Sequence, residues 1–303
     1  MATLVNMNDL QNILPEYLPI IFLAAFFSVI NGLLAYKKGF FRYPKKKAPS
    51  FYNIPLIYLL GAFLVFITLQ IFLVPLVFIL YFVIQSGEVV GLSDRIQQDP
   101  TLVGWFNVFV MSTSTLGVLF YSWLLGPQLT KMIWNKEGGI GEKRIIKNFF
   151  FGIATWLVCY PIVIALSQMI ALLLHWFFEK PEVDQVAVKA IKMTLDDPYL
   201  FGSTFICMIL LVPVLEEMLF RGFLQTWLGG LFSRKTSIVL TSIVFALFHF
   251  SYSQGLRNVE FIAALFVLSC FLGYIYERQG SLWAPIGLHV FFNTISVLTI
   301  VFS

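Results

Sequence analysis

The chain has 303 residues, of which 59% are hydrophobic and only 12% are charged. An ordinary soluble domain carries about 25% charged residues, so a soluble fold of this composition would lack the polar surface to cover itself. The net charge of +4 is too small to indicate a nucleic-acid partner. The composition therefore predicts an all-α, polytopic integral membrane protein.

Eight apolar stretches are long enough to cross a hydrocarbon core of about 30 Å. In chain order they cover residues 14–36, 54–84, 102–130, 148–178, 199–228, 236–252, 259–276 and 282–301. We expect about eight transmembrane helices, with kinks at Pro75, Pro127, Pro161 and Pro213. No Lys or Arg precedes the first stretch, so we expect a retained helix rather than a cleaved signal.

Basic residues are divided unequally between the two alternate sets of connections. One set holds 14 of the Lys and Arg residues and the other holds 5. Because positively charged connections stay on the cytoplasmic side, we expect the richer set to be cytoplasmic. Both termini are then external, and the expected location is the cell (inner) membrane.

Three ionisable residues fall inside an apolar stretch: Glu216, Glu217 and Arg221. Each costs at least ~2.5 kcal/mol at membrane depth, so the three need partners or a chemical role. Glu217 and Arg221 are four residues apart and share a helix face, so we expect an ion pair. Glu216 is rotated by about 100° from that face and does not share this partner. We therefore expect Glu216 to be the carboxylate that acts.

Two of the three histidines stand four residues from a second notable side chain. His249 follows Phe245, and His289 precedes Asn293, so each pair is expected to share a helix face. Measured from the predicted cytoplasmic helix ends at 1.5 Å per residue, Glu216, His249 and Asn293 lie at about 20, 21 and 18 Å, and His289 at about 12 Å. This coincidence of depth predicts a hydrated polar site within the bilayer. The alternative for each histidine is a hydrogen-bonded structural role.

The polar residues of the last third form three short motifs. They are Glu216-Glu217-x-x-x-Arg221, Phe245-x-x-x-His249 and His289-x-x-x-Asn293. Together they resemble the E-E-x-x-x-R, F-x-x-x-H and H-x-x-x-N motifs of the CPBP intramembrane proteases, also called the Abi family. This family includes the type II CAAX prenyl endopeptidases and proteins linked to bacteriocin processing and self-immunity. We expect residues 1–198 to form about four transmembrane helices without an assignable motif, and residues 199–303 to form a catalytic core of about four more.

The resemblance implies an all-helical, glutamic-type intramembrane peptidase that works without a cofactor, in which a glutamate and a histidine activate water. By position, it implies that Glu216 is the general base and that His249 helps to hold the water. It implies that His289 and Asn293 hydrogen-bond the oxyanion. The residues expected to brace the site are Glu217, Arg221 and Phe245.

A metalloendopeptidase is the alternative chemistry for the same residues. The sequence contains no H-E-x-x-H motif, which disfavours a classical zinc site. Glu216, His249 and His289 nevertheless have the types of side chain that a three-ligand metal site uses.

Three functions are compatible with these motifs. The first is an endopeptidase that cleaves a membrane-associated peptide, such as a prenylated CAAX protein or a bacteriocin-like peptide, among membrane lipid, with its active site open to the cytoplasm. The second is a non-catalytic immunity or scaffolding protein, which would have no need of the intact Glu, His, His and Asn. The third is a proton-coupled transporter, which should show two related halves, whereas the polar groups here fall only in the last third.

Overall fold

The computed structural model describes residues 7–43, 54–86, 99–135, 142–178 and 186–302. These residues form helices and no β-strand, which confirms the all-α class. Seven helical stretches in the described part are long and apolar enough to cross a membrane, as expected for a multi-pass membrane protein. They are Ile13–Lys37, Leu56–Gln85, Pro100–Leu124, Arg144–Phe177, Pro198–Gly229, Arg257–Gln279 and Trp283–Phe302.

The chain divides into two compact units that each combine separate segments. Unit 1 draws on residues 1–49, 141–185 and 232–288, and unit 2 on residues 50–140, 186–231 and 289–303. The expected division at residue 198 follows the motifs rather than this packing, and it stays a prediction.

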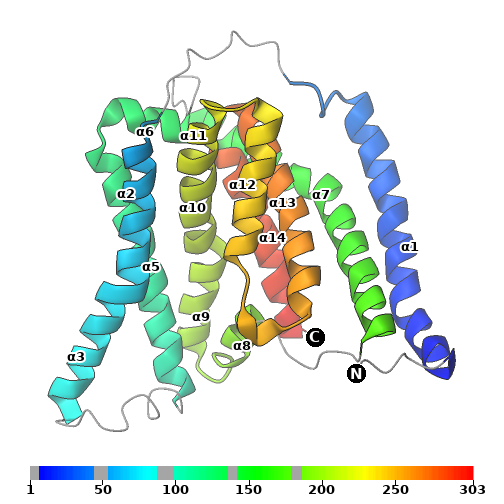
Figure 1. Ribbon diagram of the computed structural model, residues 1–303, viewed down its shortest axis with the longest axis horizontal. Helices are drawn as coiled ribbons and strands as arrows, with labels where there is room; N and C mark the ends of the chain where they lie inside the picture. Colours follow the sequence, from blue (N-terminus) through cyan, green and yellow to red (C-terminus); the bar gives the residue numbers. More distant parts are fainter. Residues whose placement is uncertain (1–6, 44–53, 87–98, 136–141, 179–185, 303) are drawn as a thin grey trace. The chain divides into compact units, whose positions relative to one another are not determined.

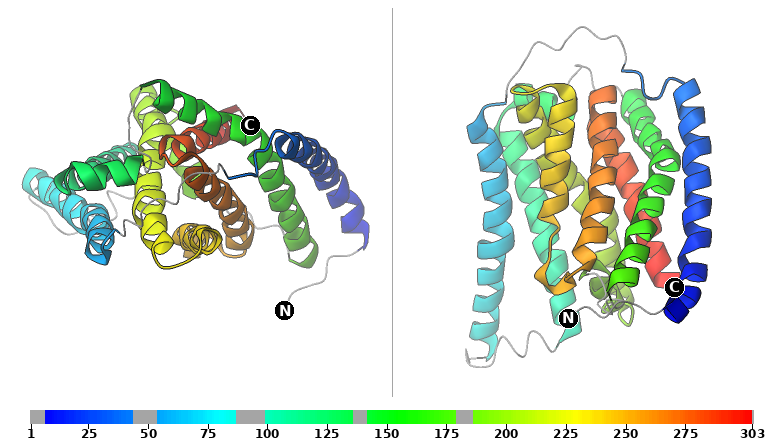
Figure 2. Two further views of the ribbon diagram at one scale, coloured as in Figure 1. Left: turned by 90° about the horizontal axis from the view of Figure 1, so that it is seen from above. Right: turned by 45° about the vertical axis from the view of Figure 1, so that its right-hand side comes forward.

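Unit 1 is built around a long helix in the middle of the chain. Its helices are α1 (Met7–Lys37), α7 (Glu142–Phe177), α12 (Arg234–Phe248), α13 (Arg257–Gln279) and the first residues of α14 (Trp283–Phe302). α7 packs against α1 and against α13, and α12 forms an antiparallel pair with α13 (Figures 1 and 2).

Glycines bring α14 against α7 at backbone distance within unit 1. A Cβ at Gly287 would overlap the carbonyl oxygen of Phe149, and one at Gly152 would overlap that of Ala284. Close backbone approach at small residues is a common way for helices to associate in membranes. This contact fixes the start of α14, the helix that carries His289 and Asn293.

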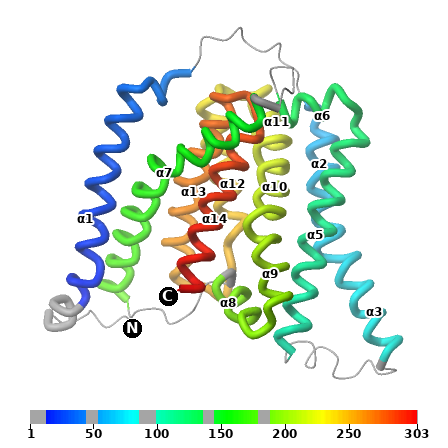
Figure 3. Tube along the Cα trace, turned by 180° about the vertical axis from the view of Figure 1, so that it is seen from behind, coloured from blue at the N-terminus to red at the C-terminus, as the bar shows by residue number. Residues whose placement is uncertain are grey.

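Unit 2 contains the remaining helices. They are α2 (Leu56–Ile67), α3 (Val74–Ser86), α5 (Pro100–Leu124), α6 (Pro127–Trp134), α8 (Val186–Lys192), α9 (Pro198–Ile206), α10 (Val212–Glu217), α11 (Thr226–Gly229) and the rest of α14. Three π-helical segments join them: η1 (Thr68–Leu73), η2 (Cys207–Leu211) and η3 (Met218–Gln225). α9 to α11 thus follow one another as a single helical column (Figure 3).

The four prolines at which we expected kinks occupy three different kinds of position in the helices. Pro75 and Pro213 each follow the sequence Leu-Val, and each is preceded by a π-helical segment that ends just before that Val. Proline has no N–H and its ring crowds the carbonyl four residues earlier, so the wider π turn accommodates it. Pro161 lies inside an unbroken α7. Pro127 instead begins α6.

Two of the eight expected helices end earlier than their apolar stretches. The stretch 102–130 is interrupted after Leu124, because Gly126 adopts a φ of 87° and the chain turns before Pro127. The stretch 236–252 contains α12, whose 15 residues end at Phe248. At 1.5 Å per residue this helix is about 22 Å long, so it is too short to cross a 30 Å core by itself.

Candidate active site

Glu216 and Glu217 lie where the α9 to α11 column changes its helical winding. They are the last two residues of α10, between the π-helical segments η2 and η3. π-Helical turns inside α-helices are frequent at functional sites. Pro213 accounts for η2, so the sequence itself positions the distortion just ahead of the two carboxylates.

Glu217 and Arg221 form the expected ion pair. An Arg221 Nη1 group donates to Glu217 Oε1 at 3.0 Å, and both side chains are 0% exposed. A buried charge is stable only when it is paired and hydrogen-bonded. The pair therefore anchors the column from within its own helix.

His289 joins this pair from α14. Its Nδ1 lies 2.8 Å from Glu217 Oε1, and its Nε2 lies 3.6 Å from Glu216 Oε2. Because a carboxylate only accepts hydrogen bonds, Nδ1 carries the proton and donates it to Glu217. One imidazole ring thus bridges the two neighbouring glutamates.

This contact is made across the difference in depth that we expected for His289. Counting helix rise put its backbone about one turn nearer the membrane surface than that of Glu216, and its ring reaches both glutamates. Helix rise locates only the backbone, and the lengths of the Glu and His side chains cover the remaining separation.

The two carboxylates differ in environment. The Glu217 side chain is 0% exposed and has both Arg221 and His289 as partners, whereas the Glu216 side chain is 19% exposed. Glu216 is therefore the carboxylate that solvent or a ligand reaches more easily.

Asn293 lies one turn after His289 on the same face of α14. Its Nδ2 donates to the carbonyl oxygen of Met208 at 2.9 Å, within η2. This hydrogen bond thus joins α14 to the π-helical segment that precedes α10. The second N–H of Asn293 makes no hydrogen bond within the described part of the chain.

His249 lies in unit 1 and outside the helix in which we expected it. It is the C-cap residue of α12, and its Nδ1 lies 2.8 Å from the carbonyl oxygen of Phe245. Side chains that bond the last carbonyls are a recognised way to end a helix. Since a carbonyl only accepts, Nδ1 carries the proton, and Nε2 of the neutral ring is an acceptor.

Phe245 supports this histidine as the motif suggested. Its side chain is 0% exposed, and the ring centroids of Phe245 and His249 are 4.8 Å apart. The structure brings Glu216, Glu217, Arg221, His289 and Asn293 together in unit 2, and Phe245 with His249 in unit 1. The common depth of Glu216 and His249 stays a prediction.

The alternative metal site also stays a prediction. Among the described residues, no three His, Cys, Asp or Glu side chains are grouped so as to hold a metal ion. Two of the three proposed ligands, Glu216 and His289, belong to unit 2 and the third, His249, to unit 1.

Sequence comparison points to the same segment. Residues 198–295 match the family model described as "Type II CAAX prenyl endopeptidase Rce1-like", which covers all three motifs and agrees with the resemblance noted above. A Bacillus subtilis (strain 168) protein described as "Uncharacterized protein YpbD" is 35% identical over 95 residues, which are 31% of this chain and 44% of that protein. The match thus spans less than half of that relative. No solved structure matches the chain.

The buried ion pair generates a stability prediction. Glu217→Ala and Arg221→Ala should each lower the free energy of unfolding by on the order of 3–5 kcal/mol, because each leaves a buried charge without its partner. Thermal melting in detergent measures this loss.

A partly exposed ion pair provides the control. Arg234 and Glu277 lie 3.5 Å apart with side chains 43% and 12% exposed, so Glu277→Ala should cost clearly less than the loss of either member of the fully buried pair. Wild-type melting of both the Glu217 and the Arg221 variants would contradict the bracing role.

Proposed function

We propose that this protein is an intramembrane endopeptidase that hydrolyses a peptide bond in a membrane-associated peptide. The observation that carries the proposal is the contact of His289 with both Glu216 and Glu217 at membrane depth. It lies inside the segment that matches a family of CAAX prenyl endopeptidases. If the network only stabilised the fold, the partly exposed carboxylate of Glu216 would not need to lie beside the imidazole of His289.

Glu216 is the general base of the proposed reaction. It takes a proton from water as the water oxygen attacks the peptide carbonyl carbon, and it returns that proton to the leaving amine when the C–N bond breaks. Its 19% exposure gives water access, while Glu217 is fully buried. His249, whose Nε2 is an acceptor in the neutral ring, helps to hold the water.

His289 and Asn293 stabilise the oxyanion. Glu217 accepts from Nδ1 of His289 and thereby fixes the orientation of the ring. For Nε2 to donate as well, the ring must carry both protons. Asn293 contributes its second amide N–H.

The proposed substrate is a peptide close to the C-terminus of a lipidated or otherwise membrane-bound chain. A prenylated CAAX protein and a bacteriocin-like peptide both fit this description. Burial of a lipid chain would add up to ~0.8 kcal/mol of binding per CH₂, which can be used to order the scissile bond beside Glu216.

The central test of this proposal is the variant Glu216→Gln. It keeps the shape of the side chain but removes the proton acceptor, so cleavage of farnesylated and unmodified CAAX peptides, measured by mass spectrometry, should be lost. Melting in detergent should match the wild type.

A carboxylate outside the site gives the matched control. Glu277→Gln, at the partly exposed pair with Arg234, should cleave at the wild-type rate. Near-normal turnover by Glu216→Gln would remove Glu216 from the mechanism. A wild-type protein that cleaves neither peptide class would instead favour the non-catalytic role.

The site opens to the cytoplasm, according to the distribution of basic residues. Single cysteines at the start of α12 and of α9 test this orientation, because Phe232 is 49% exposed and Tyr199 is 82% exposed. The background lacks the three native cysteines, Cys159, Cys207 and Cys270. Phe232→Cys should react with an impermeant maleimide from the cytoplasmic side, and Tyr199→Cys from the external side. The reverse pattern would invert the proposed orientation.

A further inference from the structure

The segment that follows His249 is not helical, although it continues an apolar stretch. After α12 ends at Phe248, Ser251 is extended, with φ −134° and ψ 127°. A short 3₁₀ turn, η4 (Tyr252–Gln254), then leads to Gly255. Gly255 has a φ of 50° and a ψ of −129°, a conformation that favours glycine. We call residues 249–256 the His249 loop.

Non-helical backbone is costly near the hydrocarbon core, because its N–H and C=O groups have no partners within a helix. One side chain of α13, that of Asn258, makes three hydrogen bonds with the backbone of the His249 loop. Asn258 Oδ1 accepts from the N–H of Ser251 at 3.0 Å. Asn258 Nδ2 donates to the carbonyl of Ser251 at 2.7 Å and to the carbonyl of Gly255 at 3.0 Å.

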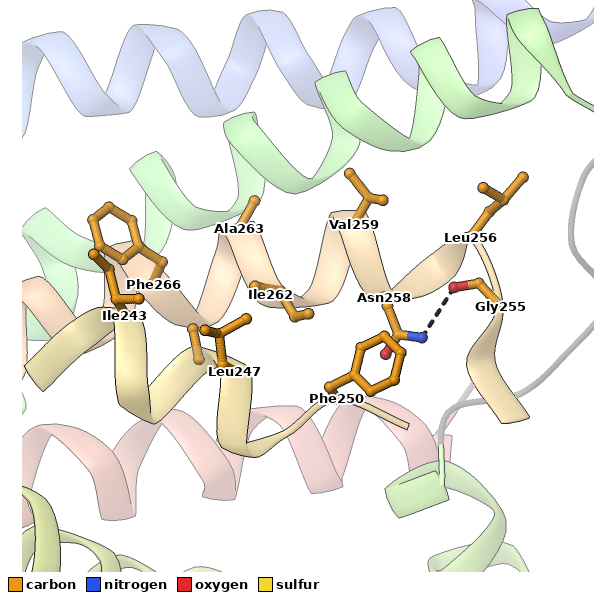
Figure 4. A pocket seen from close by; sticks show the side chains of 11 residues that line it. Ile243, Leu247, Phe250, Gly255, Leu256, Asn258, Val259, Ile262, Ala263 and Phe266 are labelled. Carbon is orange, nitrogen blue, oxygen red and sulfur yellow. Dashed lines mark hydrogen bonds between the residues drawn. The ribbon is translucent and has the colours of Figure 1, made fainter. Parts of the chain in front are cut away.

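Both the oxygen and the NH₂ group of the Asn258 amide therefore bind this loop. It is 4% exposed and lies in the first turn of α13. Figure 4 shows its amide directed at Gly255, on the wall of a mainly apolar pocket of about 520 Å³ between α12 and α13. The pocket brings no other amide or charged side chain to the loop.

Residues of α12 and α13 contact the ring of His249. Its Nδ1 bonds the carbonyl of Phe245. Its ring is tilted by 47° to that of Phe245, and it meets the ring of Phe261 edge-on at 6.2 Å. Asn258 stands one turn before Phe261, so the start of α13 holds both the ring and the backbone that follows it.

We propose that Asn258 is a positioning residue, which fixes the His249 loop and thereby aims Nε2 of His249. The inference rests on the proposed function, since it gives His249 a part in holding water. Asn258 belongs to none of the three motifs. It acts through the two backbone carbonyls and the one N–H that it binds.

The first test uses Asn258→Ala in the full-length protein with the farnesylated CAAX peptide. Because a misplacement of about 1 Å can cost about 100-fold in rate, kcat should fall by about 10- to 100-fold, with KM near the wild-type value. Asn258→Asp keeps the acceptor for Ser251 but places an oxygen against both carbonyls, so it should not restore kcat.

The second measurement is independent of activity. Hydrogen exchange followed by mass spectrometry should show faster exchange over residues 250–255 in Asn258→Ala and unchanged exchange elsewhere in unit 1. The matched control is Asn148→Ala in α7, which removes an asparagine that is also 4% exposed. This control should leave both kcat and exchange of the His249 loop unchanged.

The outcomes separate this inference from the proposed function. Wild-type kcat in Asn258→Ala, together with loss of activity in Glu216→Gln, overturns the positioning role and leaves the peptidase in place. Faster exchange throughout unit 1 also overturns it, because the asparagine would then be only a stabilising residue. If the wild type cleaves nothing, the proposed function fails, and faster exchange confined to residues 250–255 still supports the hold of Asn258 on the loop.

Discussion

The candidate site depends on one buried contact, between the carboxylate of Glu217 and the imidazole of His289. Glu217 is held by Arg221 in its own helix and binds His289 across to α14 at 2.8 Å. Without the guanidinium, the buried carboxylate would lose the cation that pairs with it in its own helix. Without the carboxylate, Nδ1 of His289 would lose the hydrogen bond that fixes the ring with Nε2 beside Glu216.

Distorted helices make room for these polar groups. The column that carries the glutamates switches to a π-helix on each side of α10, and α12 stops early at a histidine that binds the carbonyl of Phe245. Pro213, at the start of α10, removes one regular helical hydrogen bond, and at the end of α12 the His249 side chain takes the place of one. Asn293 and Asn258 then bind backbone carbonyls, at Met208 in the first case and at Ser251 and Gly255 in the second. An asparagine amide thus binds the backbone next to the two glutamates, and another binds the backbone that follows His249.

The spacing of residues along the chain predicted contacts between side chains of the same helix. The pairing of Glu217 with Arg221 follows from a separation of four residues, and the limits of most membrane helices follow from the apolar stretches. The contact of His289 with Glu217 joins residues 72 positions apart, and helix packing of that kind leaves no local pattern. The end of α12 was missed because apolar residues continue to Phe250, so hydropathy gave no sign that the His249 side chain would terminate the helix. Asn258 escaped notice because a single polar residue at a helix start is ordinary.

A double-mutant cycle between Glu217 and His289 tests the central contact most directly. Unfolding free energies in detergent would be compared for the wild type, Glu217→Ala, His289→Ala and the double variant. Residues in direct contact within one network couple by about 0.5–3 kcal/mol, and we expect a value of at least about 1 kcal/mol. A matched cycle of Glu217 with Asn293, whose amide binds Met208 instead, should give much weaker coupling. Additive effects of Glu217→Ala and His289→Ala would contradict the account.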